Sequence, residues 1–370
     1  MGKNTTSRDT YCAAVKTLRA DGSGPVTRKA EQEAHKTGKL NPLVDPAGFG
    51  IIRRSLPRLE KQDSGLWLLT VGTPMPIETR VDTTGSMGNN VDIAFRVLPD
   101  TYEQCGSVLP GYDIQIATGI FGDVCDNFVL CRPQFEMEAL KIVEQMTLMV
   151  PERNGGDATE DPQYGLFGAA YLTYRHINQI GLKGYDFTVS DAPGRTRIDA
   201  DTLKRVFGNE VFDKAAENGH QINPKDIPST KEAVRDLLRD THAFFLQVES
   251  SNITREFWTD VFGKDRIVTL PDTELLPQVQ ASIIGLTEGT LALKQVEKFL
   301  TENNVSNDEA RQIARSVANI PIGAQVALPN FSRRPRKGDL FKNKTDPWPV
   351  NQDEAPESAS EKEPAGPTWL

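Results

Sequence analysis

The sequence predicts an α/β fold: a doubly wound, mostly parallel open sheet with helical additions at the N- and C-terminal ends. Strand-like and helix-like segments alternate through the middle of the chain, which is the pattern of a parallel sheet. Two of the strand-like segments run directly into loops rich in Asp, Ser and Thr. In an open parallel sheet such loops meet at one edge, where ligands bind. A length of 370 residues allows one large domain with additions.

The first polar loop follows the strand-like segment 76–82. Asp82, Thr84 and Ser86 place one carboxylate and two hydroxyls at alternating positions, and Gly85 lets the loop turn tightly. Hard oxygen donors of this kind are the ligands that Mg²⁺ and Mn²⁺ prefer. The alternative is an ordinary helix N-terminus, where the same residue types cap free N–H groups.

Two further loops supply candidate oxygen donors. A Gly-Gly loop at 155–161 presents Thr159 just before a predicted helix, and the strand-like segment 185–190 ends at Asp191. If the sheet is parallel, the strand-end loops lie at the same edge as Asp82. We therefore expect the three loops to form one metal site.

In this order, Asp-x-Thr-x-Ser, Gly-Gly-x-x-Thr and a strand closing in Ser-Asp resemble the von Willebrand factor A (vWA) domain with its metal-ion-dependent adhesion site. The resemblance covers about residues 63–290 and is to the intracellular type of prokaryotes and phages, with its vWA/Rossmann-like sheet. It implies a bound Mg²⁺ or Mn²⁺, with one coordination position left for an Asp or Glu of a partner protein. The metal ligands that it implies are Asp82, Thr84, Ser86, Thr159 and Asp191.

The resemblance implies a protein-binding adaptor and not an enzyme. Because cytosolic vWA proteins often partner AAA+ ATPases, an accessory role in an ATP-driven assembly is one form of this hypothesis. A competing hypothesis is a metal-dependent phosphoester hydrolase, in which the acidic neighbours Asp157, Glu160 and Asp161 would help the metal to activate water. A nucleophilic Ser86 would require a base such as His242, which is distant in sequence.

Composition excludes several other classes. A formal net charge of −9 argues against nucleic-acid binding through a basic face. The polar segment 1–13 is no secretion signal, and no run of 18 apolar residues could cross a membrane. The four cysteines form no Cys-x-x-Cys pair, which favours buried free thiols in a reducing compartment. We therefore expect a cytoplasmic protein.

The chain divides into a helical arm at 1–62, the main domain at 63–290 with an insertion at 192–227, further helices at 291–327 and a disordered tail at 328–370. Capping boxes are expected at Ser229 and Ser306. Segment 77–81 is less apolar than a central buried strand usually is.

Strands are expected over 66–71, 76–82, 114–120, 128–131 (antiparallel to its neighbour), 185–190, 242–248 and 266–270. Helices are expected over 86–105, 135–150, 161–179, 199–207, 209–217, 229–240, 254–262, 274–284, 290–302 and 308–320.

Overall fold

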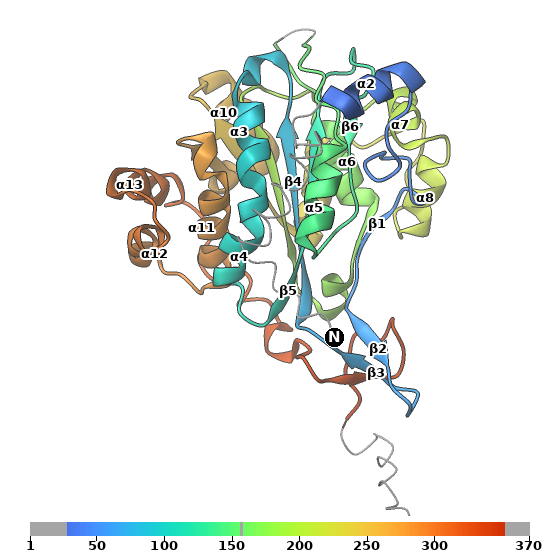
Figure 1. The fold of residues 1–370 in the computed structure, drawn as a ribbon, viewed down its shortest axis with the longest axis vertical. Helices are drawn as coiled ribbons and strands as arrows, with labels where there is room; N and C mark the ends of the chain where they lie inside the picture. The colour runs from blue at the N-terminus through green and yellow to red at the C-terminus, as the bar shows by residue number, and fades with distance from the viewer. Residues whose placement is uncertain (1–27, 156–157, 352–370) are drawn as a thin grey trace, which may run out of the picture.

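The computed structural model describes residues 28–155 and 158–351. Its centre is a six-stranded sheet with the strand order β10-β9-β8-β4-β5-β6, in which every neighbouring pair is parallel except β5 with β6 (Figure 1). This confirms the predicted fold class, including the antiparallel edge strand. The strands are β4 (Thr73–Asp82), β5 (Tyr112–Phe121), β6 (Leu130–Cys131), β8 (Gly184–Ser190), β9 (Thr241–Val248) and β10 (Ile267–Leu270).

Helices cover both faces of this sheet, and each face has its own apolar core (Figure 1). Side chains alternate along the strands: in β9, Phe244 and Leu246 enter the first core and Phe245 the second. The first core is covered by α3 (Asn90–Val97), α4 (Thr101–Val108), α5 (Ala139–Thr147), α11 (Leu276–Glu288), α12 (Val296–Glu302) and α13 (Asn307–Ser316). The second is covered by α6 (Gln163–Tyr171), α7 (Ala200–Phe207), α8 (Val211–Glu217), α9 (Thr230–Asp240) and α10 (Asn252–Phe262).

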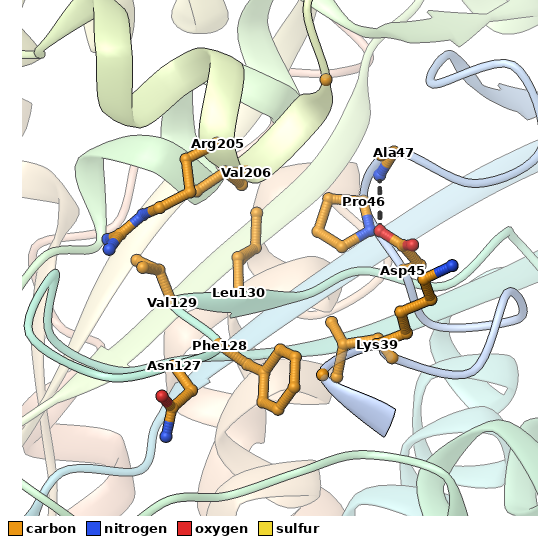
Figure 2. Close-up of a pocket in the computed structure, with 13 residues that line it drawn as sticks. Lys39, Asp45, Pro46, Ala47, Asn127, Phe128, Val129, Leu130, Arg205 and Val206 are labelled. Atoms are coloured by element: carbon orange, nitrogen blue, oxygen red, sulfur yellow. Dashed lines mark hydrogen bonds between the residues drawn. The ribbon is translucent and has the colours of Figure 1, made fainter. Parts of the chain in front are cut away.

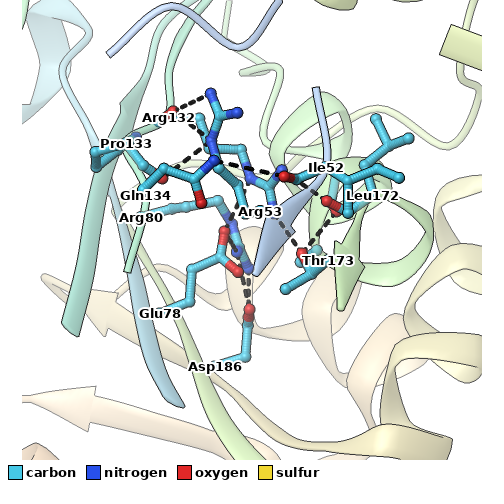
Figure 3. A network of polar contacts seen from close by, with 12 residues as sticks. Ile52, Arg53, Glu78, Arg80, Arg132, Pro133, Gln134, Leu172, Thr173 and Asp186 are labelled. Carbon is cyan, nitrogen blue, oxygen red and sulfur yellow. Dashed lines mark hydrogen bonds and ion pairs between the residues drawn. The ribbon is translucent and has the colours of Figure 1, made fainter. Parts of the chain in front are cut away.

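The polar character of central strand β4 has a structural cause. Glu78 and Arg80 both point to the α6 face, where they join a buried ionic network with Asp186 of β8 (Figure 3). Arg80 Nη1 lies 2.9 Å from Asp186 Oδ2 and 3.4 Å from Glu78 Oε1. Glu78 also contacts Arg132 Nε at 3.1 Å and Arg175 Nη2 at 3.4 Å. Ionic pairing therefore replaces apolar packing on one face of β4.

Helix α6 lies directly over this network because it presents glycines to it. A Cβ atom at Gly165 would lie 2.5 Å from Cδ of Arg80, and one at Gly168 would lie 3.3 Å from the Arg132 guanidinium carbon. The predicted continuation of this helix to residue 179 is wrong. The chain leaves the helix at Leu172 and forms β7 (Thr173–Arg175), which pairs in parallel with β1 (Arg53–Ser55).

Two other predicted helices are also shorter than expected. The helix expected over 86–105 is two helices, α3 and α4, separated by a short turn that contains Pro99. The helix expected over 135–150 begins only at Ala139, because Glu136 pairs with Ile116 of β5 by two backbone hydrogen bonds of 2.8 Å. Both predicted capping boxes, at Ser229 and at Ser306, are present.

The N-terminal region is not a separate helical arm over the part that the structure describes. After α2 (Arg28–Thr37) the chain is largely extended and packs on the domain, and β1 adds to it through β7. Arg53 is fully buried and donates to the backbone carbonyls of Arg132 and Pro133. A buried arginine thus fixes this region to the sheet. The first part of the predicted arm, residues 1–27, lies outside the described residues.

The predicted disordered tail is wrong for residues 328–351. β11 (Leu340–Phe341) pairs with β3 (Trp67–Leu69), which also pairs with β2 (Leu59–Lys61), at the opposite end of the molecule from the tip of β4 (Figure 1). Arg334 stacks on the Tyr112 ring at 4.4 Å, and Phe341 is buried. A few anchoring side chains hold this polar segment, which composition alone does not reveal. Residues 352–370 lie outside the described residues.

Candidate metal centre

The first candidate loop begins where β4 ends at the buried Asp82. Thr83 holds the loop to β5, since its backbone N–H and its hydroxyl both donate to the Phe121 carbonyl, at 2.9 and 3.0 Å. A short helical turn, Gly85–Met87, follows, and Gly88 has a φ of +49°. The turn exposes Ser86 to solvent while Thr84 stays buried.

A chain of hydrogen bonds joins four of the five predicted ligands. Asp82 Oδ1 accepts from the Thr84 hydroxyl at 2.7 Å and from its backbone N–H at 2.9 Å. The Thr84 and Ser86 hydroxyl oxygens lie 3.3 Å apart, and Ser86 donates to Asp191 Oδ1 at 2.9 Å. Ser190, at the end of β8, donates to Asp82 Oδ2 at 2.5 Å. The loops after β4 and β8 therefore meet at one edge, as the sequence predicts.

The fifth predicted ligand, Thr159, lies on a loop that is held against the other two. Gly85 donates to the Asn154 carbonyl at 2.9 Å, and the backbone N–H of Glu160 donates to the Pro193 carbonyl at 3.0 Å. Thr159 is half-buried, and its carbonyl accepts from Arg195 Nη2 at 3.3 Å. The loop is thus at the site, and the direct role of the Thr159 hydroxyl stays a prediction.

Glu160 is at the site but was not among the predicted ligands. It is only 3% exposed, and among the residues that the structure describes its Oε2 atom has no hydrogen-bond partner. Burial is the main cause that raises the pKa of Glu160 to about 8, and the negative charge of Asp82 adds to the rise. A hydrogen bond with the Thr84 side chain lowers the pKa and partly opposes these two effects. The sequence signal was its position directly after Thr159, which we interpreted only as an acidic neighbour.

The other two carboxyl groups of the site also resist ionisation. Burial is the main cause that raises the pKa of Asp82 to about 6, with a further contribution from the charge of Asp191, while hydrogen bonds from Ser190 and Thr84 oppose the rise. Burial likewise raises the pKa of Asp191. Three carboxyl groups in one partly buried site produce a negative charge that a divalent cation would neutralise.

The donor atoms fit a hard cation. Within residues 28–155 and 158–351, no group of three or more His, Cys, Asp and Glu side chains is arranged to hold a metal ion by itself. A metal here would be held by hydroxyl oxygens together with carboxylates, which suits Mg²⁺ or Mn²⁺ better than a metal that prefers nitrogen or sulfur. Ser86 is exposed and Asp191 half-buried, so solvent and a partner can approach the ion from their side.

A second acidic group lies behind the site and already contains a cation. Arg195 Nε lies 3.1 Å from Asp161 Oδ1, and Arg195 Nη2 lies 3.8 Å from Asp123 Oδ1. Asp161 also accepts from the backbone N–H of Val124 at 2.8 Å. These two carboxylates are thus already paired with a guanidinium.

His242, the candidate base for a nucleophilic Ser86, is at the other end of the sheet. It lies at the start of β9, whereas Ser86 follows the end of the parallel strand β4. Its Nε2 atom is 3.1 Å from Gln325 Oε1, and burial lowers its pKa to about 3. This geometry excludes the Ser86–His242 pair.

A separate cavity of about 300 Å³ lies between the N-terminal region, the segment before β6 and α7 (Figure 2). Phe128 and Leu130 form part of its wall, with Lys39 and Arg205 at its margin. None of the five predicted metal ligands lines it. Among the described residues, no helix is long and apolar enough to span a membrane.

The segment 192–227 borders the site with its first residues and then packs on the second core. Leu203 and Phe207 of α7 and Val211 of α8 are buried there, and Phe207 contacts Phe167 of α6 with ring centroids 6.2 Å apart. Arg205 donates to the Val124 carbonyl at 2.7 Å. The helices of the segment 192–227 are therefore part of the helical layer over the second core.

Comparison with known proteins gives structural likenesses alone. No protein-family model and no curated protein sequence matches the chain. Proximal thread matrix protein 1 of the mussel byssus is 11% identical, with a TM-score of 0.37 over 59% of this chain and 47% of that one. The pilus adhesin SpaC of Lactobacillus rhamnosus GG is 14% identical, with a TM-score of 0.40 over 64% of this chain and 34% of that one.

The vWF domain of the pilus tip protein Mfa5 from Porphyromonas gingivalis is 10% identical, with a TM-score of 0.38 over 58% of this chain and 95% of that one. The chain thus spans less than half the length of the first two proteins and nearly all of the isolated domain. The description of the fold as a doubly wound, mostly parallel sheet rests on the observed strand order, with its antiparallel edge strand β6.

Proposed function

We propose that this protein is a metal-dependent protein-interaction module that binds a partner carboxylate through a Mg²⁺ or Mn²⁺ ion. The hydroxyls of Thr84, Ser86 and Thr159 would hold the ion, together with the carboxylates of Asp82 and Asp191, directly or through water. A bound ion would attract an acidic side chain of the partner. The partner's Asp or Glu would complete the coordination.

The observation that supports this proposal is the hydrogen-bond chain from Asp82 through Thr84 and Ser86 to Asp191. In this chain, hydroxyl groups bridge neighbouring oxygen atoms. A cation could bind the same oxygens in place of these hydrogen bonds. The hydrogen-bond chain starts in the core at Asp82 and passes through the exposed Ser86 to the half-buried Asp191, so the inner carboxylate orients donors that face the solvent. Because the protein has a net charge of −9, a divalent ion would create a local positive spot on an otherwise acidic molecule.

The cellular setting is part of the proposal. We propose a cytoplasmic adaptor of the prokaryotic or phage type, with an AAA+ ATPase as one candidate partner. The residues that follow Asp191, in the segment 192–227, border the metal edge and would contribute to partner choice. Binding to nucleic acid or to membranes is not expected at this acidic edge.

The phosphoester hydrolase is the second candidate, and one observation counts against it. Two-metal hydrolysis needs a second ion about 4 Å from the first. The neighbouring carboxylates of Asp123 and Asp161 instead contact the Arg195 guanidinium. We therefore expect no turnover of phosphoesters or nucleotides under Mg²⁺ or Mn²⁺.

Calorimetric titration of Mn²⁺ tests the proposal. Asp82→Ala and Ser86→Ala should each abolish or strongly weaken binding, while the exposed Asp201→Ala, on α7, should bind as the wild type does. Because Ser86 is exposed, replacing it should leave the fold intact. The Ser86→Ala variant therefore distinguishes a loss of metal ligands from unfolding. Wild-type-like binding by both site variants would refute the assigned ligands. Metal-dependent turnover that disappears in Asp191→Ala would favour the hydrolase.

Partner capture completes the test. The immobilised protein should retain a partner in Mg²⁺ and release it in EDTA. Equal retention in both buffers would place binding away from the metal edge.

A further inference from the structure

Glu160 occupies a place in the site that its sequence position did not reveal. Its backbone is fixed against the loop after β8, because its N–H donates to the Pro193 carbonyl at 3.0 Å and it forms a parallel bridge with Gly194. Gly194 follows Asp191 by three residues, so the backbone of Glu160 is held beside the third loop. This position does not depend on the flexibility of a surface side chain.

The side chain of Glu160 points into the site. It is 3% exposed, and the groups that act on it electrostatically or by hydrogen bonding include Asp82, Thr84 and Asp191, three of the predicted ligands. Among the described residues, Oε2 has no hydrogen-bond partner. A buried carboxylate oxygen without a donor is costly unless something else compensates it.

The neighbouring cation does not supply this compensation. Arg195 contacts Asp161 and Asp123, which form the second acidic group. It also donates to the Thr159 carbonyl. Asp82, by contrast, receives three hydrogen bonds on its two oxygens, from Thr84 and Ser190. Glu160 Oε2 is thus a buried carboxylate oxygen that remains available to bind an ion.

We infer that Glu160 is a direct ligand of the metal ion and that the loop at 158–160 contributes to the site chiefly through this carboxylate, with Thr159 in a lesser role. The inference rests on the proposed metal site and deepens it. The Glu160 carboxylate, from the loop before α6, would then join the hydroxyl oxygens as a direct ligand, with Asp82 and Asp191 acting directly or through water. Such a site should bind its ion without a partner, since each further anionic ligand strengthens the hold on a hard cation.

Mn²⁺ titration followed by electron paramagnetic resonance tests the assignment on the full chain. Glu160→Gln should weaken Mn²⁺ binding by about ten-fold or more, as expected for loss of a ligand or its close support. Thr159→Ala should weaken it by a smaller factor. The matched control is Glu302→Gln, an exposed residue of α12 whose side chain is 65% accessible, which should bind Mn²⁺ as the wild type does.

A second measurement distinguishes direct ligation by Glu160 from an effect of its charge alone. Water-proton relaxation counts the water molecules on bound Mn²⁺, and Glu160→Ala should have more of them than the wild type has. Unchanged hydration with weakened binding would overturn direct ligation. Thermal melts of each variant show whether it is folded.

The outcomes distinguish the inference from the proposed function. If the wild type binds Mn²⁺ and Glu160→Gln binds equally well, the inference fails and the metal site stands. If Thr159→Ala loses more affinity than Glu160→Gln, Thr159 is the principal ligand of its loop and the inference is overturned. If the wild type does not bind Mn²⁺, the proposed function fails, and the inference with it.

Discussion

Replacing Glu78 by Gln should destabilise the fold by about 3–5 kcal/mol, the usual cost of removing one partner of a buried ion pair. Glu78 is 2% exposed and contacts the guanidinium groups of Arg80, Arg132 and Arg175 at 3.1–3.4 Å. Gln keeps the shape of the side chain and one acceptor oxygen but removes the charge. Asp186 would then be the remaining carboxylate among these three buried cations.

The pKa of Glu78 gives an independent estimate of this magnitude. Burial alone would raise the pKa, but the charges of Arg132, Arg80 and Arg175 outweigh burial and lower the pKa from 4.5 to about 2. A shift of this size corresponds to about 3 kcal/mol. Because the folded-state pKa lies below the unfolded-state value, this stabilisation is present above pH 4.5 and is lost as the pH falls towards 2.

Denaturant unfolding at pH 7 measures the effect, with Glu274→Gln as the matched control. Glu274 pairs with Arg96 on the surface, where both side chains are more than half exposed, so its loss should cost no more than about 1 kcal/mol. The difference between the wild type and Glu78→Gln should be constant from pH 5 to 8 and smaller at pH 4. A loss below about 1 kcal/mol at pH 7 would refute the idea that Glu78 holds the network together.

Two further predictions concern regions away from the metal edge. A chain that ends after residue 327 should melt several degrees lower than one that ends after residue 351, because Phe341 is buried and Arg334 packs on Tyr112. Equal melting temperatures of the two chains would contradict this packing. Burial lowers the pKa of His242 to about 3, so the folded state resists its protonation and should lose stability as the pH falls below 6.5. The His242→Gln variant should show a weaker pH dependence of stability between pH 6.5 and 4.5 in denaturant unfolding.

The sequence predicted the site better than it predicted the chain ends. Asp82, Thr84, Ser86 and Asp191 come together because parallel strands bring their carboxyl ends to one edge, and this rule depends on local pattern alone. Glu160 was not singled out because its place at the site depends on the approach of two loops that are distant in sequence. No pattern around residue 160 encodes the hydrogen bond from its N–H to the Pro193 carbonyl.

The chain ends were mispredicted for a related reason. Composition indicates whether a segment can bury a core by itself, but it does not show whether a few side chains can use a core that already exists. Arg53 fixes its region through backbone carbonyls, and Arg334 through an aromatic ring. In both cases the signal is an arginine, which sequence analysis assigns to the solvent by default.

The unusual polarity of β4 and the site at its end are parts of one arrangement. Arg80 of β4 bonds Asp186 of β8, and two residues beyond Arg80 the carboxylate of Asp82 accepts a hydrogen bond from Ser190 of β8. The two strands are thus joined by side chains at two levels, in addition to their backbone pairing. Because a slip of one residue would turn every side chain to the opposite face, the buried ionic pair opposes any change of register. The network below the edge therefore fixes the relative position of the loops after β4 and β8, which a metal site built from both loops requires.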